Sequence, residues 1–149
     1  MNIKKRIAVV AQESFKAELI NWAYFNRKVL NQHDLIATGE MGNVLEGTTN
    51  TPVIKLASAP LGGYSQLGRM IKEGEVDMII FFCNPFEIHI ADGEVKSLHM
   101  IAEKNNIIIA TNRGTADFVL SSSLMTTDHP IFEHDYAAYT KRKAAYCTN

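Results

Sequence analysis

The sequence predicts an α/β fold in which a five-stranded parallel sheet carries helices on both faces. Three observations support this fold class. Short apolar runs rich in β-branched residues recur along the chain, as is typical of strands buried on both faces. Longer segments with helical spacing of apolar residues separate these runs. Each run is followed by turn residues and then a helical segment, an order that favours parallel strands with right-handed crossovers.

The predicted strands are the shortest and most apolar segments. They lie at residues 7–11, 33–38, 52–57, 76–82 and 107–110. The fourth contains the run MIIFF and is therefore expected in the centre of the sheet. The strand–helix rhythm breaks after residue 120, where residues 130–132 could add a further short strand.

Helices are predicted at residues 14–30, 40–46, 64–73, 94–105 and 111–120, with a terminal helix at residues 135–146. In the first helix Leu19 and Trp22 fall near one face, and Ser14 is the expected N-cap. Gly47 is expected to end the second helix and Gly74 the third.

Composition limits the class of protein. The chain has 149 residues and is expected to form a single domain over residues 1–149. Its 15 basic and 16 acidic residues nearly cancel, which argues against a nucleic-acid polymer as a partner bound by bulk charge. The two cysteines and the scattered histidines have no metal-ligand spacing, so neither a metal nor another cofactor is expected. Without a signal peptide or a long apolar stretch, we expect a cytoplasmic protein with no membrane partner.

The loops after the predicted strands are the expected ligand site, because ligands of such sheets bind at the carboxyl ends of the strands. Residues 38–43 place a hydroxyl and two glycines where a strand turns into a helix, and residues 58–63 form a second turn of this kind. Glycine exposes backbone N–H groups, and a helix N-terminus favours anions. Lys16 could add a point charge. These features predict a phosphate or carboxylate cradle, although ordinary βα turns use the same residue types.

Acid–base candidates are few, and neither the P-loop nor the Rossmann glycine motif is present. Glu13 ends the first strand, where a carboxylate could face a ligand. His89 follows the fourth strand and could act as a base. Asp92 and Glu94 open a helix, where acidic side chains commonly interact with the helix dipole.

Several strings in these loops resemble methylglyoxal synthase. They are Arg6-Ile7-Ala8-Val9-Val10-Ala11 with Lys16, Ala37-Thr38-Gly39-x-x-Gly42-Asn43, Pro60-Leu61-Gly62-Gly63-x-x-Gln66-x-Gly68, Phe81-Phe82-x-x-Pro85, and Ala110-Thr111-Asn112-x-x-Thr115-Ala116-Asp117-Phe118. The resemblance implies the methylglyoxal-synthase-like fold, a flavodoxin-like three-layer arrangement, and a homo-hexamer. It also implies conversion of dihydroxyacetone phosphate to methylglyoxal. In that reaction a carboxylate removes a carbon-bound proton and the enediolate expels phosphate.

The sequence departs from the family at the groups that transfer protons. The family's His-Asp pair after the first strand is Gln12-Glu13, and the aspartate expected to act as base is Tyr64. The next loop has Asn84 in place of an aspartate and Ala91 in place of a histidine. A tyrosine with an ordinary pKa near 10 is a poor base at neutral pH.

The phosphate side is mostly kept. Lys16, Thr38 and Ser58 match the family's phosphate ligands, whereas Glu40 and Met41 stand where the family has a second hydroxyl. The basic end of the last predicted helix resembles the family's arginine that reaches a neighbouring subunit. The expected binding residues are Gln12, Lys16, Thr38, Gly39, Met41, Ser58, Ala59, Gly62, Gly63, Tyr64, Asn84 and Lys143.

This pattern favours a binding module over an enzyme, because anion-binding groups remain while proton-transfer groups are replaced. The ligand would be a phosphorylated small molecule (a nucleotide, a nucleotide-derived signal or a sugar phosphate), bound for sensing, regulation or sequestration. The alternative is a methylglyoxal synthase, a carbon–oxygen lyase, with Glu13 as base helped by Gln12 or His89. A different lyase or isomerase acting on a sugar phosphate is a third hypothesis.

Overall fold

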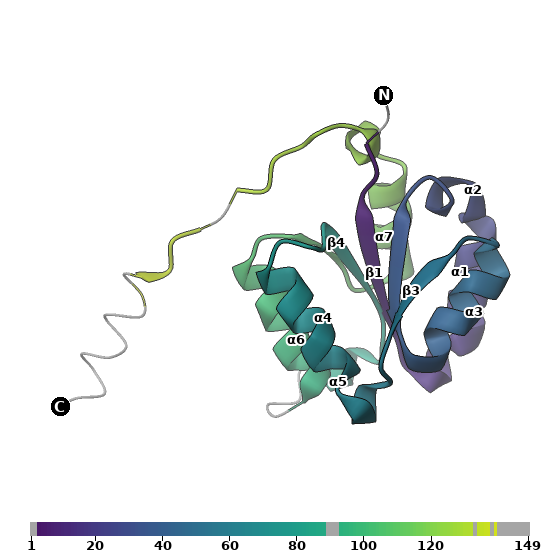
Figure 1. Ribbon diagram of the computed structural model, residues 1–149, viewed down its shortest axis with the longest axis horizontal. Coiled ribbons are helices and arrows are strands. Elements are labelled where there is room, and N and C mark those ends of the chain that lie inside the picture. The colour runs from purple at the N-terminus through teal and green to yellow at the C-terminus, as the bar shows by residue number, and fades with distance from the viewer. Residues whose placement is uncertain (1–2, 89–92, 133, 138, 140–149) are drawn as a thin grey trace.

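A computed structural model describes residues 3–88, 93–132, 134–137 and 139, and its strands form one parallel sheet (Figure 1). The strands are β1 (Arg6–Ala11), β2 (Asp34–Thr38), β3 (Val53–Leu56), β4 (Met78–Phe82) and β5 (Ile108–Ala110). Their order is β3-β2-β1-β4-β5, with every neighbouring pair parallel. The predicted fold class is confirmed. The direction of strand addition reverses at β1, so β1 and β4 border the switch point at which α/β sheets bind ligands.

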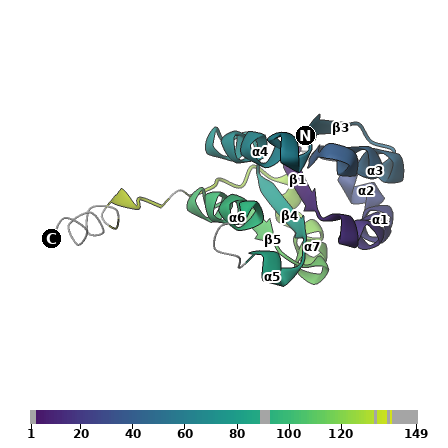
Figure 2. The ribbon, with the colours of Figure 1, turned by 90° about the horizontal axis from the view of Figure 1, so that it is seen from below.

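Helices cover both faces of the sheet (Figures 1 and 2). One core contains side chains of α1 (Lys16–Phe25), α3 (Gly39–Thr49) and α7 (Arg113–Leu120), and the other contains side chains of α4 (Gly63–Lys72) and α6 (Glu94–Lys104). The shorter elements are α2 (Arg27–Leu30), α5 (Pro85–Ile88), η1 (Glu13–Phe15), η2 (Ala59–Leu61) and η3 (Ser123–Thr126). Within the described ranges, no helix is long and apolar enough to cross a membrane.

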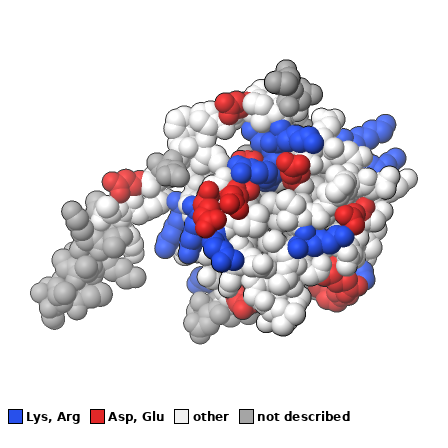
Figure 3. Space-filling model, viewed as in Figure 1, with Lys and Arg blue, Asp and Glu red and all other residues white. Residues whose placement is uncertain are grey.

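The central strands are apolar on both faces because each face has its own core. In β1, Ile7 and Val9 belong to the core under α1 and α3, while Ala8 and Val10 belong to the core under α4 and α6. Successive side chains of a strand point to opposite faces, so an uninterrupted apolar run is needed where both faces are covered. On the visible surface, basic and acidic side chains are interspersed (Figure 3), in keeping with the nearly balanced composition.

The helix predicted at residues 14–30 is broken into η1, α1 and α2. Asn26 lies at the break, where its amide nitrogen donates to the Trp22 carbonyl at 3.0 Å and to Asp117 at 3.1 Å. Asparagine competes with helical backbone in this way. Ser14 is not an N-cap, since it lies inside η1 and Phe15 precedes α1.

Other predicted boundaries also differ. α3 continues through Gly47 and ends before Asn50, whose left-handed φ of 55° terminates the helix. The loop at residues 83–93 contains the short helix α5. Residues 130–132 are not a strand. Most of the terminal helix predicted at residues 135–146 lies outside the described residues.

Candidate functional site

The loops after β2 and β3 touch at the carboxyl edge of the sheet. A Cβ atom placed on Gly39 would lie 3.1 Å from the Cα atom of Ser58, and Gly39 has a φ of +56°. Both the close approach and the left-handed backbone require glycine here. Thr38, which precedes α3 at its N-cap position, is 6% exposed. The structure therefore brings together Thr38, Gly39 and Ser58, as the sequence predicted.

The turn after β3 is held by backbone hydrogen bonds. The Ser58 carbonyl accepts the N–H groups of Leu61 at 2.9 Å and of Gly63 at 3.0 Å. Gly62 has a φ of +97°, and a Cβ atom on Gly63 would lie only 1.9 Å from the Ala57 oxygen. The two glycines are thus required by the turn itself. They start α4 beside the loop that contains Ser58, so its first N–H groups lie at the same edge.

Lys16 forms an ion pair with Glu40, with 3.3 Å between Nζ and Oε1. The pair connects the first turn of α1 to the first turn of α3. The sequence analysis noted only that Glu40 stands where the family has a hydroxyl, and it did not predict this contact. The contact could have been suspected because a lysine and a glutamate follow two strands that were predicted to be neighbours. The contact places the ammonium group at a helix N-terminus, where the helix dipole favours an anion.

Gln12 and Asn84 connect the ends of β1 and β4. The Asn84 N–H donates to Oε1 of Gln12 at 2.7 Å, and the Phe86 N–H donates to Oδ1 of Asn84 at 2.9 Å. Both side-chain oxygens are therefore used inside the loops. Neither side-chain nitrogen has a hydrogen-bond partner among the residues that the structure describes. Two amide donors are thus available at the switch point.

Tyr64 is a hydrogen-bond donor and not a base. Its ring packs against the core under α4 and α6. Burial is the largest cause that raises the pKa of Tyr64 to about 12, followed by the nearby Cys83 and Glu94. The phenol is therefore protonated at neutral pH and can donate to an oxyanion.

Glu13 is exposed in η1, directly after β1 and Gln12. It is the sequence-predicted base that the structure places at the carboxyl edge. Ala59 lies in η2, beside Ser58. His89 and Lys143, the other predicted site residues, lie outside the described residues.

Met41 was also predicted as a ligand-binding residue, and the structure directs its side chain into the core. Its side chain is 6% exposed and belongs to the core under α1 and α3, together with Leu45. Residues four apart share one face of a helix, so Met41 follows Leu45 toward the sheet while Glu40 remains at the surface.

Comparisons with known proteins point to one family. A family profile described as the MGS-like domain matches residues 18–111. The chain is 42% identical to a methylglyoxal synthase of Coxiella burnetii over 93% of this chain and 96% of the relative. It is 40% identical to one of Pectobacterium atrosepticum over 91% of this chain and 90% of the relative. A crystal structure of methylglyoxal synthase from Elizabethkingia anophelis NUHP1 has 38% identity and a TM-score of 0.82, covering 93% of this chain and 91% of that one.

These relatives contradict the expectation of a binding module without catalytic activity. They are named as enzymes and align with this chain over nearly their whole length, so they favour the alternative, methylglyoxal synthase. The leaning against an enzyme has no support in these comparisons. The family itself, expected from the loop strings, is confirmed: the chain belongs to the MGS-like family, whose relatives named here are methylglyoxal synthases.

Proposed function

We propose that this protein is a methylglyoxal synthase, a carbon–oxygen lyase that converts dihydroxyacetone phosphate to methylglyoxal and phosphate. The observation that carries the proposal is the 42% identity to the Coxiella burnetii enzyme over 93% of this chain. The cradle at the carboxyl edge supports it, because its hydroxyls, glycines and lysine suit the phosphate of such a substrate.

The phosphate would bind between Lys16, the Thr38–Gly39 turn and Ser58. Lys16 now contacts Glu40, and a phosphate dianion would replace that carboxylate as the partner of the ammonium group. The first N–H groups of α3 add the positive end of the helix dipole.

The carbon end of the substrate would lie near Gln12, Glu13 and Asn84. In the proposed reaction Glu13 removes a proton from the hydroxymethyl carbon, which is the carbon next to the carbonyl that carries no phosphate, and an enediolate forms. The amide nitrogens of Gln12 and Asn84, with the Tyr64 phenol, donate to the oxygen that becomes negative. The hydroxyl of the enediolate then gives up its proton and its oxygen becomes the aldehyde oxygen. The carbon–carbon double bond moves to the phosphate-bearing carbon, and the carbon–oxygen bond to phosphate breaks. The enol that remains takes up a proton and becomes methylglyoxal.

The test is a turnover assay with dihydroxyacetone phosphate that measures methylglyoxal and inorganic phosphate together. We expect equal release of both products from the wild-type protein. Glu13→Gln should lower kcat by about 100-fold or more, because general-base catalysis typically contributes that much. Glu18→Gln, which makes the same charge change on the exposed first turn of α1, should have little effect.

Two outcomes would count against parts of this proposal. A wild-type protein without turnover contradicts the proposed activity. Turnover that survives in Glu13→Gln contradicts only the assignment of the base and leaves His89 as the sequence-predicted candidate.

We also propose a homo-oligomer, and a hexamer by resemblance to the family, with Lys143 reaching a neighbouring subunit. Large exposed apolar side chains support an interface, since Phe25 is 74% exposed and Phe118 is 82% exposed. A stable monomer in sedimentation at micromolar concentration would contradict this proposal. The single domain and the cytoplasmic location remain predictions.

A further inference from the structure

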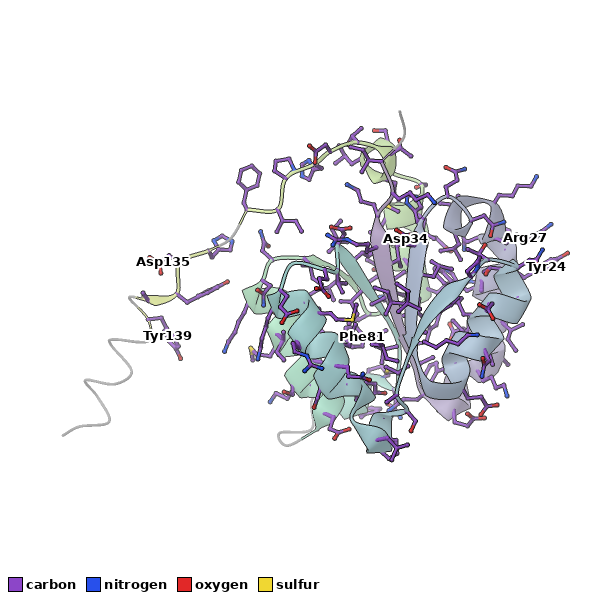
Figure 4. All side chains as sticks on the ribbon, viewed as in Figure 1. Tyr24, Arg27, Asp34, Phe81, Asp135 and Tyr139 are labelled. Carbon is purple, nitrogen blue, oxygen red and sulfur yellow. The ribbon has the colours of Figure 1, made fainter. Side chains whose placement is uncertain are left out.

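An apolar cavity of about 310 Å³ lies at the amino edge of the sheet, opposite the candidate active site. Its apolar wall consists of Ile108 in β5, Val119 in α7 and Leu124 with Met125 in η3. Residues 130–132 complete the wall. In Figure 1 the segment after α7 crosses this end of the sheet, and the labelled Asp135 and Tyr139 show where it continues away from the body (Figure 4).

A buried cation lines the same cavity. Lys5 is only 8% exposed, and its Nζ atom donates to the Thr127 carbonyl at 2.7 Å. No carboxylate lies within ion-pair distance of Lys5 among the described residues. An ammonium group has three donors, and burying it without an anion is costly. The site therefore has unmet capacity for an acceptor with negative charge.

Asp77 is the carboxylate of the lining, and the charge of Lys5 helps to lower the pKa of Asp77, but no direct ion pair joins the two side chains. Asp77 instead accepts the Arg6 backbone N–H at 2.8 Å and two guanidinium hydrogen bonds at 3.1 Å. His129 is exposed at the cavity margin and offers no carboxylate. His33 lies behind Lys5, where its Nδ1 atom accepts the Lys5 backbone N–H at 2.9 Å.

We propose that this cavity binds a small carboxylate with an apolar tail. The carboxylate would accept from the Lys5 ammonium group, and the tail would pack against Ile108, Val119 and Met125. Apolar pockets with a few convergent polar groups are the usual form of small-molecule sites. A volume of about 310 Å³ is at the lower end of the range of small-molecule pockets, so the cavity suits a small ligand. Octanoate is a probe of that size.

The ligand would hold the C-terminal segment against the sheet. It would contact β5, η3 and residues 130–132 at once, so binding should increase the protection of the segment from hydrogen exchange.

The experiment compares octanoate with octan-1-ol, which has the same tail without the charge, in titrations of the full chain by calorimetry. We expect octanoate to bind more tightly by roughly tenfold to a hundredfold, as a charge-assisted hydrogen bond to a buried group contributes. Lys5→Met should abolish this difference and leave octanol binding unchanged. Lys4→Met, at the exposed neighbouring position, should retain it.

A second variant keeps the test decisive if Lys5→Met does not fold. Leu124 is 48% exposed, so Leu124→Trp can fill the cavity mouth without replacing a core residue, and it should weaken both probes. The proposal is overturned if octanoate binds no better than octanol to the wild-type protein, or if Leu124→Trp leaves octanoate binding unchanged. Displacement of octanoate by inorganic phosphate would also overturn it, because that result would place the probe at the carboxyl edge.

Discussion

The two edges of the sheet differ in how their polar groups are satisfied. At the amino edge polar groups bind one another: Arg6 pairs with Asp77, and Lys5 contacts His33 and Thr127. At the carboxyl edge the backbone bends through glycines, and side-chain amides keep unused donors. The same strands thus begin among polar groups that mostly bind one another, beside the cavity lined by Lys5, and end in loops whose side-chain amides have unused donors. The paired groups of the amino edge stabilise the strands whose opposite ends position the candidate site.

The largest effect is expected where the carboxyl edge depends on backbone geometry. Gly63→Ala should lower the free energy of unfolding by roughly 3 kcal/mol or more, because a Cβ atom would lie 1.9 Å from the Ala57 oxygen. Denaturation with urea measures this loss.

Gly47→Ala is the matched control. Gly47 lies within α3, and a Cβ atom there would have no neighbour within 4 Å. This variant should gain about 0.5–1 kcal/mol, since alanine is the better helix former. Equal losses in both variants would mean that close approach is not what Gly63 provides.

The next largest effect concerns the network at the amino edge. Burial alone would raise the pKa of Asp77, but hydrogen bonds from the Arg6 side chain and backbone outweigh it and hold that pKa below its usual value. Asp77→Asn should therefore cost about 1.5–3 kcal/mol near neutral pH. A depressed folded-state pKa contributes stability above the unfolded value of about 3.9, and this contribution is lost as pH falls through the folded pKa.

Unfolding measured from pH 7 to pH 2 tests this sign. The difference between the wild-type protein and Asp77→Asn should shrink only at acidic pH. Asp128→Asn, a change at an exposed position of the C-terminal segment, is the control and should follow the wild-type curve. A difference that is constant down to pH 2 would contradict the role given to the Asp77 carboxylate.

A smaller effect is expected from His33 at the same edge. Burial, and then the positive charge of Lys5, lowers the pKa of His33, and its Nε2 atom is buried without a partner among the described residues. Below about pH 6.5 the unfolded chain takes up a proton that folded His33 does not. Stability should therefore fall toward acidic pH, by at most about 1.4 kcal/mol per pH unit, until the folded pKa is reached.

His33→Gln removes the titrating group while keeping an acceptor for the Lys5 N–H. This variant should reduce the dependence of the free energy of unfolding on pH just below pH 6.5. The control is His129→Gln, a change at an exposed position, which should leave that dependence as it is in the wild-type protein. An unchanged slope in His33→Gln would show that another group titrates in this window.

The smallest effect is expected at the Lys16–Glu40 pair of the carboxyl edge. Exposed ion pairs contribute about 0.2–1 kcal/mol, so Glu40→Gln should tighten binding of inorganic phosphate by up to roughly fivefold. Calorimetric titration measures the change in phosphate affinity. Glu18→Gln makes the same charge change at a residue that does not pair with Lys16, so it should change the phosphate affinity little. Weaker phosphate binding in Glu40→Gln would mean that Glu40 positions Lys16 and does not compete with the ligand.

Much of the site could be predicted because turn chemistry is local. The glycines at positions 39, 62 and 63 have backbone conformations or close neighbours that only glycine permits. Their positions in the sequence therefore indicated the two loops that form the predicted phosphate cradle. The proton-transfer candidates could not be assigned to a function in this way. The replacement of family acids suggested a binding module, whereas the relatives' near full-length similarity favours an enzyme.

The sequence by itself determined the order of strands and helices, since periodicity and turn residues act over a few positions. It also determined which loops end the strands, because parallel strands place their carboxyl ends at one edge. Only the tertiary structure decided the contacts between distant segments. Examples are the inward direction of Met41, the Lys16–Glu40 pair and the Lys5 cavity closed by residues 130–132. These contacts depend on how each helix is turned about its axis and on packing between residues that are far apart in the sequence. A local sequence pattern does not encode either property.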